Sequence, residues 1–303
     1  MKNAENSEGW KIESLAISIS DTVAAHIHNA AFQGWVLSCF PTACNLVDEL
    51  DRVVSLVTAA VGDGPLNIVV GDKEPFAGIA AGMAAHANRD RATVGDRLTV
   101  NLKNAARWNP AVEWGEVPAT AMATLWEVVQ KRATPDSLLT FWVPAIRPLG
   151  GARMALQEAA RDAAERLLLA LRRGDEANIV THVLTLAGLG PGSTPAGDDF
   201  LIGLMTGLRA WPTFQLPEEL SVEDACRLIG QVAIPRTNTF SAAQLTAARE
   251  GHMGSGWHRL AAALAINDRP AIREEADRLL AVGATSGADA MAGFLGPYLL
   301  TST

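Results

Sequence analysis

Cysteine is scarce in this chain of 303 residues, and no cysteine has the spacing of a metal-binding motif. Cys39, Cys44 and Cys226 form no CxxC or CxxH pair, which excludes the usual zinc motifs and is typical of a reducing compartment. No apolar run approaches the roughly 18 residues that would span a bilayer, and residues 1–14 contain no apolar signal core. We therefore expect a cytoplasmic protein with no membrane-embedded segment.

Clusters of positive charge are also missing. The chain has 25 basic and 33 acidic residues, a net charge of −8, and its basic residues form nothing larger than short pairs such as Arg172 and Arg173. Nucleic acid is not an expected partner, because binding it requires a basic surface. With 49% hydrophobic residues, the chain can instead bury a large core in one or two domains.

The sequence pattern changes near residue 115. Before it, β-rich runs such as GWVLSCF, LNIVVG and DRLTVNL are separated by Gly-Asp turn signals, which predicts a β-barrel or β-sandwich over residues 1–115. After it, alanine- and leucine-rich patterns predict a mostly α-helical domain over residues 116–303, so the fold class is α+β. The stretch 141–151 is interpreted as a rigid connection with a solvent-facing Arg147. Helices are expected at 119–133, 152–173, 176–187, 199–211, 221–231, 239–250, 256–266, 269–281 and 288–299.

A glycine-rich run, GLGPGSTPAGDD from Gly188 to Asp199, directly precedes the apolar stretch FLIGLMTGL. Its glycines permit unusual backbone angles and its prolines restrict the loop to few shapes. Free N–H groups in such a loop and at the start of the next helix can bind an anion or a carbonyl group. A plain helix cap is the alternative, yet a cap needs only one such residue. The predicted ligand-binding residues here are Gly190, Gly192, Ser193, Thr194, Gly197 and Asp198.

A second segment, GATSGADAMAG from Gly283 to Gly293, repeats part of this pattern. Glycine, aspartate and glycine occur at positions 197, 199 and 203 in the first segment and at 287, 289 and 293 in the second. Each glycine that follows the aspartate lies one helical turn later, where its missing side chain lets another backbone approach. We expect two helices that cross near their N-termini and bring Asp199 and Asp289 to one pocket. This segment adds Thr285, Ser286 and Gly287 to the predicted ligand-binding residues.

Between these two segments, PRTNTFSAAQLTAAREG places four hydroxyl or amide side chains at a helix start. Arg236 next to them is suited to bind a phosphate or carboxylate through its planar guanidinium. A surface ion pair beside ordinary capping is the alternative for this arginine. Thr237 and Thr239 complete the predicted ligand-binding residues.

Together, the segments GLGPGSTPAGDDF, RTNTFSAAQLTAAREG and GATSGADAMAG resemble the AllH-like family, which includes one subunit of oxamate carbamoyltransferase. The resemblance covers about residues 175–300, although relatives commonly have a bulky apolar residue where Ser193 stands and serine where Ala196 stands. It implies a role in purine and allantoin catabolism. There, a heteromeric enzyme exchanges oxalurate and phosphate with oxamate and carbamoyl phosphate. Other subunits and a small anionic substrate are therefore the implied partners.

A carbamoyl phosphate site needs hydrogen-bond donors for the phosphate, which the loop amides and Arg236 could supply. Nearby carboxylates would repel that phosphate. Either a divalent ion such as Mg²⁺, bound by Asp199 and Asp289, bridges them, or an aspartate faces the amide of the carbamoyl group or orients the loop. Neighbouring helix positions point about 100° apart, so Asp199 is expected in the pocket and Asp198 as the helix cap. The predicted catalytic residues are Asp199, Asp289 and Arg236.

Other candidate chemistry is weaker. His26 and His28 lie two apart, as neighbours on one strand face would, and are interpreted as structural. Ser193 has no nearby base and no GxSxG motif around it. Three functions stay open: a carbamoyltransferase subunit, a non-catalytic assembly subunit of such a complex, and a metal-assisted amide or ureide hydrolase. The last is disfavoured because histidine-rich ligand spacing is missing.

Overall fold

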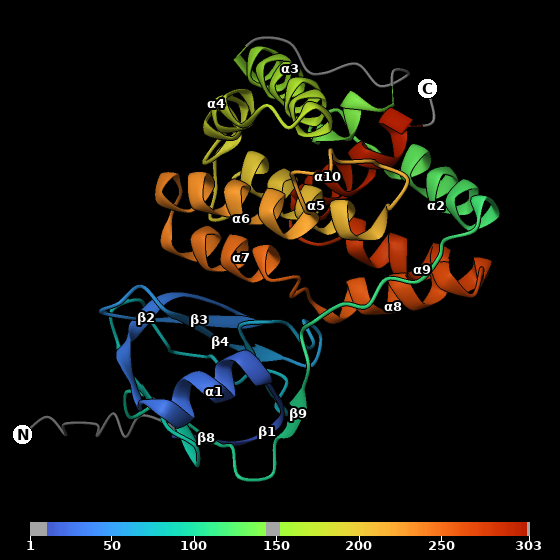
Figure 1. Ribbon diagram of the computed structural model, residues 1–303. Coiled ribbons are helices and arrows are strands. Elements are labelled where there is room, and N and C mark those ends of the chain that lie inside the picture. The colour runs from blue at the N-terminus through green and yellow to red at the C-terminus, as the bar shows by residue number, and fades with distance from the viewer. Residues whose placement is uncertain (1–10, 144–151, 302–303) are drawn as a thin grey trace, which may run out of the picture. The chain divides into compact units, whose positions relative to one another are not determined.

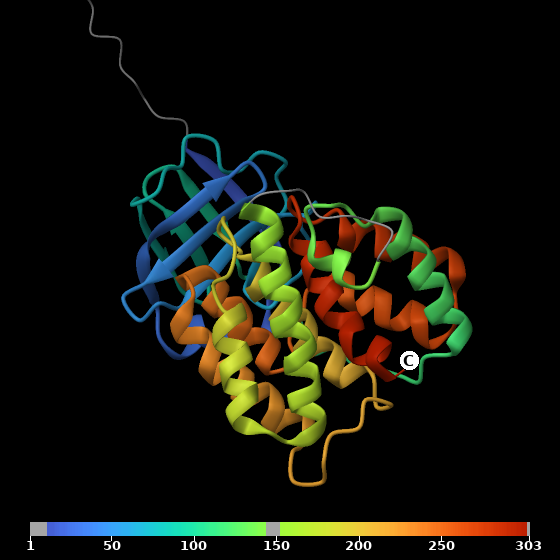
Figure 2. The same ribbon diagram turned by 90° about the horizontal axis from the view of Figure 1, so that it is seen from above.

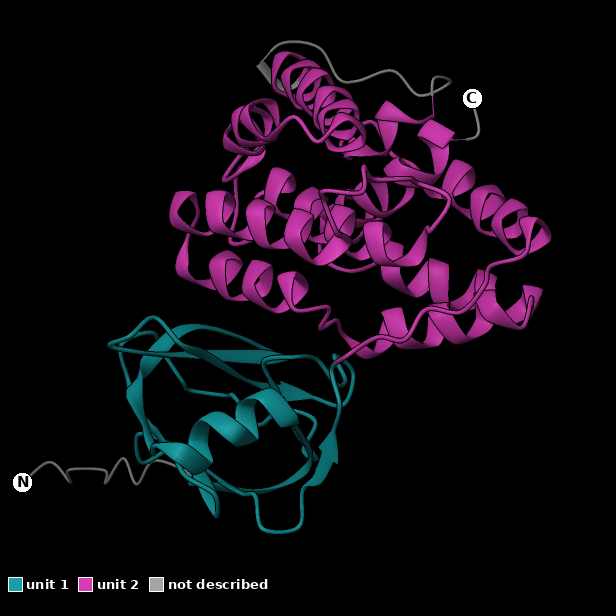
Figure 3. Cartoon of the chain, in the orientation of Figure 1, with its two compact units in different colours: residues 1–110 teal, residues 111–303 magenta. Residues whose placement is uncertain are grey.

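The computed structural model describes residues 11–143 and 152–301 of the chain. The chain forms two compact units, Met1–Pro110 and Ala111–Thr303 (Figure 3), called the barrel unit and the helical unit below. Arg147 of the expected rigid connection lies outside the described residues.

The barrel unit is a closed β-barrel in its described part, not a sandwich. Closure depends on β1, whose residues Ile12–Leu15 pair parallel with β8 while Ala16–Ile19 pair antiparallel with β5. Between them the strands run in the order β5-β4-β3-β2-β6-β7-β8. Strand β9 extends the sheet beside the end of β1 (Figure 1). The strands are β1 Ile12–Ser20, β2 Phe32–Phe40, β3 Ala43–Asp48, β4 Val53–Thr58, β5 Asn67–Val70, β6 Ala84–Ala87, β7 Arg91–Val94, β8 Leu98–Asn101 and β9 Ala106–Trp108.

A helix that the sequence patterns did not predict, α1 (Asp21–Asn29), follows β1. The Ser20 hydroxyl accepts a hydrogen bond from the Thr22 N–H, and Val23, Ala24 and Ile27 form a short buried stripe at helical spacing. His26 and His28 are therefore on a helix, and the strand-face interpretation of these histidines was wrong. Residues two positions apart on a helix are separated by about 200° around its axis, so the two imidazoles face different surroundings.

The helical unit contains every helix expected from the sequence, with ends that differ by at most three residues. Two short 3-10 helices, η1 (Leu138–Phe141) and η2 (Ile234–Arg236), precede α3 and α7. None of the described helices is long and apolar enough to cross a membrane. The α-helices are α2 Ala119–Arg132, α3 Ala152–Arg173, α4 Glu176–Leu186, α5 Ala196–Ala210, α6 Val222–Ala233, α7 Thr239–Arg249, α8 Ser255–Ala265, α9 Arg269–Leu280 and α10 Ser286–Thr301.

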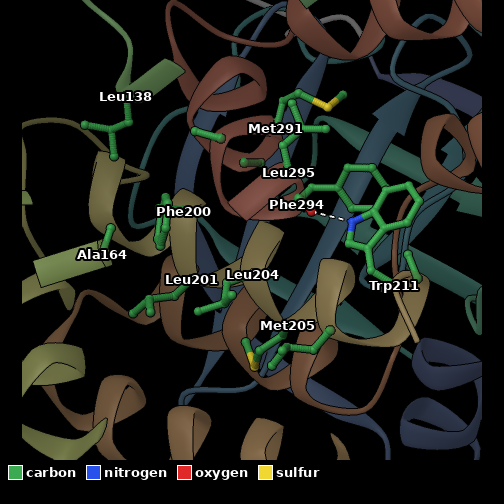
Figure 4. Close-up of a cluster of buried hydrophobic side chains, with 14 of the residues drawn as sticks. Leu138, Ala164, Phe200, Leu201, Leu204, Met205, Trp211, Met291, Phe294 and Leu295 are labelled. Carbon is green, nitrogen blue, oxygen red and sulfur yellow. Dashed lines mark hydrogen bonds between the residues drawn. The ribbon is translucent and has the colours of Figure 1, made fainter. Parts of the chain in front are cut away.

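Helices α5 and α10 form the centre of this unit and are surrounded by the other helices (Figures 1 and 2). Phe200 and Leu204 from α5 and Phe294 from α10 are fully buried in the same apolar cluster (Figure 4). The Trp211 indole donates a 2.6 Å hydrogen bond to the Phe294 carbonyl oxygen, close to Pro297, which interrupts the backbone ladder of α10. The candidate site lies at the beginnings of these two central helices.

Candidate functional site

Helices α5 and α10 cross through two glycines. A Cβ added to Gly203 would lie 1.7 Å from the Ala290 carbonyl oxygen, and one added to Gly293 would lie 1.9 Å from the Phe200 carbonyl oxygen. Each helix therefore accepts the backbone of the other where a side chain cannot fit. The predicted close approach of the two helices is confirmed.

The glycine loop before α5 adopts a backbone that requires glycine. Gly188, Gly190 and Gly192 have φ angles of 72°, 114° and 106°, which side chains of L-residues disfavour. In the described structure the N–H groups of Gly190, Gly192, Ser193 and Thr194 have no hydrogen-bond partner. Four backbone donors in five residues thus stay available next to the positive end of α5.

Asp198 holds this loop in place. Its carboxylate accepts a 2.7 Å hydrogen bond from the Gly188 N–H and another from the Thr237 hydroxyl before α7. The side chain is fully buried, and burial raises the pKa of Asp198 although the Thr237 and Gly188 hydrogen bonds oppose the rise. The expectation that Asp198 caps α5 was wrong, because α5 begins at Ala196 with Pro195 as its N-cap residue.

The start of α7 binds the middle of the loop. The Asn238 side-chain amide and the Ser241 hydroxyl donate to the Ser193 carbonyl oxygen at 3.1 Å and 3.3 Å. Asn238 also caps α7 by accepting from the Ser241 N–H. These two residues complete the site, and their sequence signal was the crowding of polar residues at this helix start.

The start of α10 meets the end of the same loop. The hydroxyl groups of Thr194 and Ser286 lie 2.8 Å apart and share a hydrogen bond. Thr285 precedes α10, and its carbonyl oxygen accepts from the Asp289 N–H. The structure therefore brings together the three segments that the sequence singled out.

Asp199 lies beneath this hydroxyl pair, with 7% of its surface exposed. Burial raises the pKa of Asp199 to about 8, and the charges of Asp289 and Asp198 add to this rise. Hydrogen bonds from the Ser286 and Thr194 hydroxyl groups oppose it. Its Oδ2 atom is buried and has no hydrogen-bond partner among the described residues. At neutral pH this carboxyl is consequently protonated and uncharged for most of the time.

Asp289, the counterpart of Asp199 on α10, is fully buried. Its Oδ1 accepts a 2.7 Å hydrogen bond from the Leu138 N–H at the start of η1. This contact joins residues 151 positions apart, and no local sequence pattern indicates it. Asp289 therefore anchors η1 to the start of α10.

Arg236 reaches the site with its backbone and not with its side chain. A Cβ on Gly188 would lie 2.7 Å from the Arg236 carbonyl oxygen, whereas the Arg236 side chain is exposed and pairs with no group in the described structure. Thr239 is the first residue of α7, and the Gly197 and Gly287 backbones pack against α4 and α9. The guanidinium thus stands apart from the buried carboxyls.

The carboxyls do not form a ready metal centre. The described part of the chain holds no group of three or more His, Cys, Asp or Glu side chains that could bind a metal ion. Asp198 and Asp289 already accept backbone N–H groups, and Asp199 is mostly protonated. Asp198 orients the loop, which is one of the alternatives to a bridging ion.

A hollow in the helical unit, of about 480 Å³, is lined by Arg209, Arg227 and Arg249 among others. Its arginines are already engaged: Arg209 donates to the Ala248 and Arg249 carbonyl oxygens at the end of α7, and Arg227 pairs with Asp224. The glycine loop, with four free amides, is the better candidate for a ligand.

Two family models match the chain. The one described as oxamate carbamoyltransferase subunit AllH matches residues 186–297, and the one described as the AllH family N-terminal domain matches residues 15–107. Together they cover most of the chain. The chain belongs to the AllH family. No curated protein and no solved structure matches it.

The AllH match begins at the last residue of α4 and ends inside α10. It therefore includes the glycine loop, the start of α7 and the start of α10, which are the three segments in contact. The N-terminal match lies within the barrel unit.

Proposed function

We propose that this chain is a subunit of a heteromeric carbamoyltransferase of the oxamate carbamoyltransferase type, acting in purine or allantoin catabolism. Its substrate site would be the junction of the glycine loop with the starts of α7 and α10. The observation that supports this most is the contact among three polar segments inside the region matched by the AllH family.

The proposed reaction transfers a carbamoyl group between nitrogen and phosphate. An oxygen of hydrogenphosphate attacks the ureido carbon of oxalurate, and the bond from that carbon to the oxamate nitrogen breaks. The phosphate proton ends on that nitrogen, which gives oxamate and carbamoyl phosphate. Free amides at a helix N-terminus suit the anionic groups of every participant.

The test is a carbamoyl-transfer assay on the complex reconstituted from all its subunits. We expect a chain with both Thr194→Val and Ser286→Ala to assemble normally but to lower transfer by about tenfold or more, because each hydroxyl lost removes roughly 1 kcal/mol of hydrogen bonding. Thr181→Val is the matched control, since the Thr181 hydroxyl bonds only the Ala177 carbonyl within α4. Melting temperatures of the variants separate loss of the site from loss of the fold.

Two outcomes would contradict the proposal. Full transfer by a complex that lacks this chain would remove it from the enzyme. Normal transfer by the double variant would leave the glycine loop without a catalytic role and favour the non-catalytic assembly subunit.

A further inference from the structure

The proposed site has two chemically different ends. Toward the surface are the N–H groups of Gly190, Gly192, Ser193 and Thr194, which have no partner in the described part of the chain. Toward the interior is Asp199, which is more than nine-tenths buried and has an Oδ2 atom with no partner. The outer end offers hydrogen-bond donors, and the inner end presents a carboxyl group.

The inner end cannot receive an anion. The charges of Asp289 from α10 and Asp198 from α5 raise the pKa of Asp199, and no basic side chain among the described residues forms an ion pair with it. An anion placed there would meet only negative or neutral groups. A neutral group with both a hydrogen-bond donor and an acceptor fits better, because an uncharged carboxyl can donate through O–H and accept through oxygen.

Primary amides and carbamoyl groups have this double character. We propose that the site takes a small two-ended ligand, with an uncharged amide or carbamoyl group at Asp199 and an anionic group at the free loop amides of residues 190–194. This assignment rests on the proposed function for the identity of the ligand. It adds the orientation of the ligand in the site and the residue that binds its uncharged group. Thr194 links both ends, since its N–H is free and its hydroxyl contacts Ser286.

The site should therefore distinguish oxamate from oxalate. The two molecules have nearly the same size, but oxalate has a second carboxylate in place of the amide. We expect the full chain at pH 6 to bind oxamate at least about tenfold more tightly than oxalate, since the second carboxylate of oxalate can only accept hydrogen bonds and its charge is repelled by the acidic groups around Asp199. Isothermal titration calorimetry with these two probes measures the ratio.

The pH dependence assigns the effect to Asp199. Its ionisation near pH 8 removes the donor and adds a negative charge, so oxamate affinity should fall between pH 6 and pH 9. Asp199→Asn keeps a neutral donor and acceptor, and it should retain oxamate binding without this fall. Asp199→Leu should lose the preference for oxamate over oxalate. Asp175→Asn, at the start of α4, is the matched control and should behave like the wild type.

Three results would overturn the inference: oxalate bound as tightly as oxamate, an Asp199→Asn variant with the pH dependence of the wild type, or no binding of either probe by the isolated chain. Circular dichroism reports whether Asp199→Leu has folded, and Asp199→Asn keeps the test decisive if it has not. These outcomes differ from failure of the proposed function, because they concern ligand binding by the isolated chain and not transfer by the complex.

Discussion

At the scale of single residues, Asp198 and Asp199 show how neighbours in sequence acquire different chemistry. Both are buried, but Asp198 accepts hydrogen bonds from Gly188 and Thr237, whereas Asp199 keeps one oxygen without a partner. The sequence correctly predicted that these two side chains face different directions, because consecutive residues of a helix point about 100° apart. It assigned the wrong role to Asp198, since the true helix start depends on Pro195.

The raised pKa of Asp199 predicts a specific pH dependence of stability. Between the ordinary value of 3.8 and about 8, the folded chain holds a proton on Asp199 that the unfolded chain releases. The stabilisation is complete below pH 4 and is lost as the pH rises through 8, at up to about 1.4 kcal/mol per pH unit. In urea unfolding at several pH values, the unfolding free energy of the wild type minus that of Asp199→Asn should therefore fall as pH rises.

Asp175 provides the control for that measurement. Asp175 is half-buried, and hydrogen bonds from Asn178 lower its pKa, so the contribution of this group to stability changes with pH in the opposite direction. The wild type minus Asp175→Asn difference should rise between pH 2 and pH 4. A flat difference for Asp199→Asn across pH 5 to 8 would show that Asp199 is ionised in the folded chain.

At the scale of elements, the helical unit contains a repeated pattern of sequence and contacts. Helices α4 and α5 correspond to α9 and α10: Asp175 and Asp268 cap the first helix of each pair, and Gly203 and Gly293 receive the backbone of the opposite helix. The sequence spacing indicated the second half of this repeat, and the caps extend it. The proposed site lies where the two copies begin.

This geometry predicts that Gly203→Ala destabilises the chain although alanine favours helices. The added methyl would overlap the Ala290 carbonyl at 1.7 Å, so the two central helices must separate. We expect a loss of roughly 2–3 kcal/mol of unfolding free energy, the size typical of overpacking, against a gain in helix propensity of about 1 kcal/mol. Urea unfolding measures the net change.

Gly296→Ala on α10 is the matched control, because its nearest neighbour at 3.1 Å is a methyl group of Leu168 that can move. This variant should lie within about 1 kcal/mol of the wild type. Equal stability of Gly203→Ala and the wild type would mean that the crossing is looser than the structure indicates.

At the scale of the whole molecule, the sequence predicted those helices and strands that depend on a local residue pattern. Helical periodicity located α2 to α10 because each has an apolar stripe and clear end signals, and turn signals separated the strands. It did not reveal α1, which is short, nor the closure of the barrel, which depends on β1 pairing with both β5 and β8. The Asp289 contact with Leu138 was equally hidden, since only the tertiary fold joins residues so far apart.

The barrel unit should fold without the helical unit. Its strands form a closed ring in which β1 pairs with β8 and with β5, and its apolar cluster includes the fully buried Phe32 and Leu46. A closed barrel leaves few strand edges unpaired, so a fragment of residues 11–110 should show strand-type circular dichroism and a cooperative thermal transition. A fragment of residues 11–66 is the control, because it lacks β5 to β9 and leaves β1 without any of its partner strands; it should show no cooperative transition. If the longer fragment also melts without cooperativity, the barrel depends on the helical unit for its stability, and the two units must be treated as one folding unit.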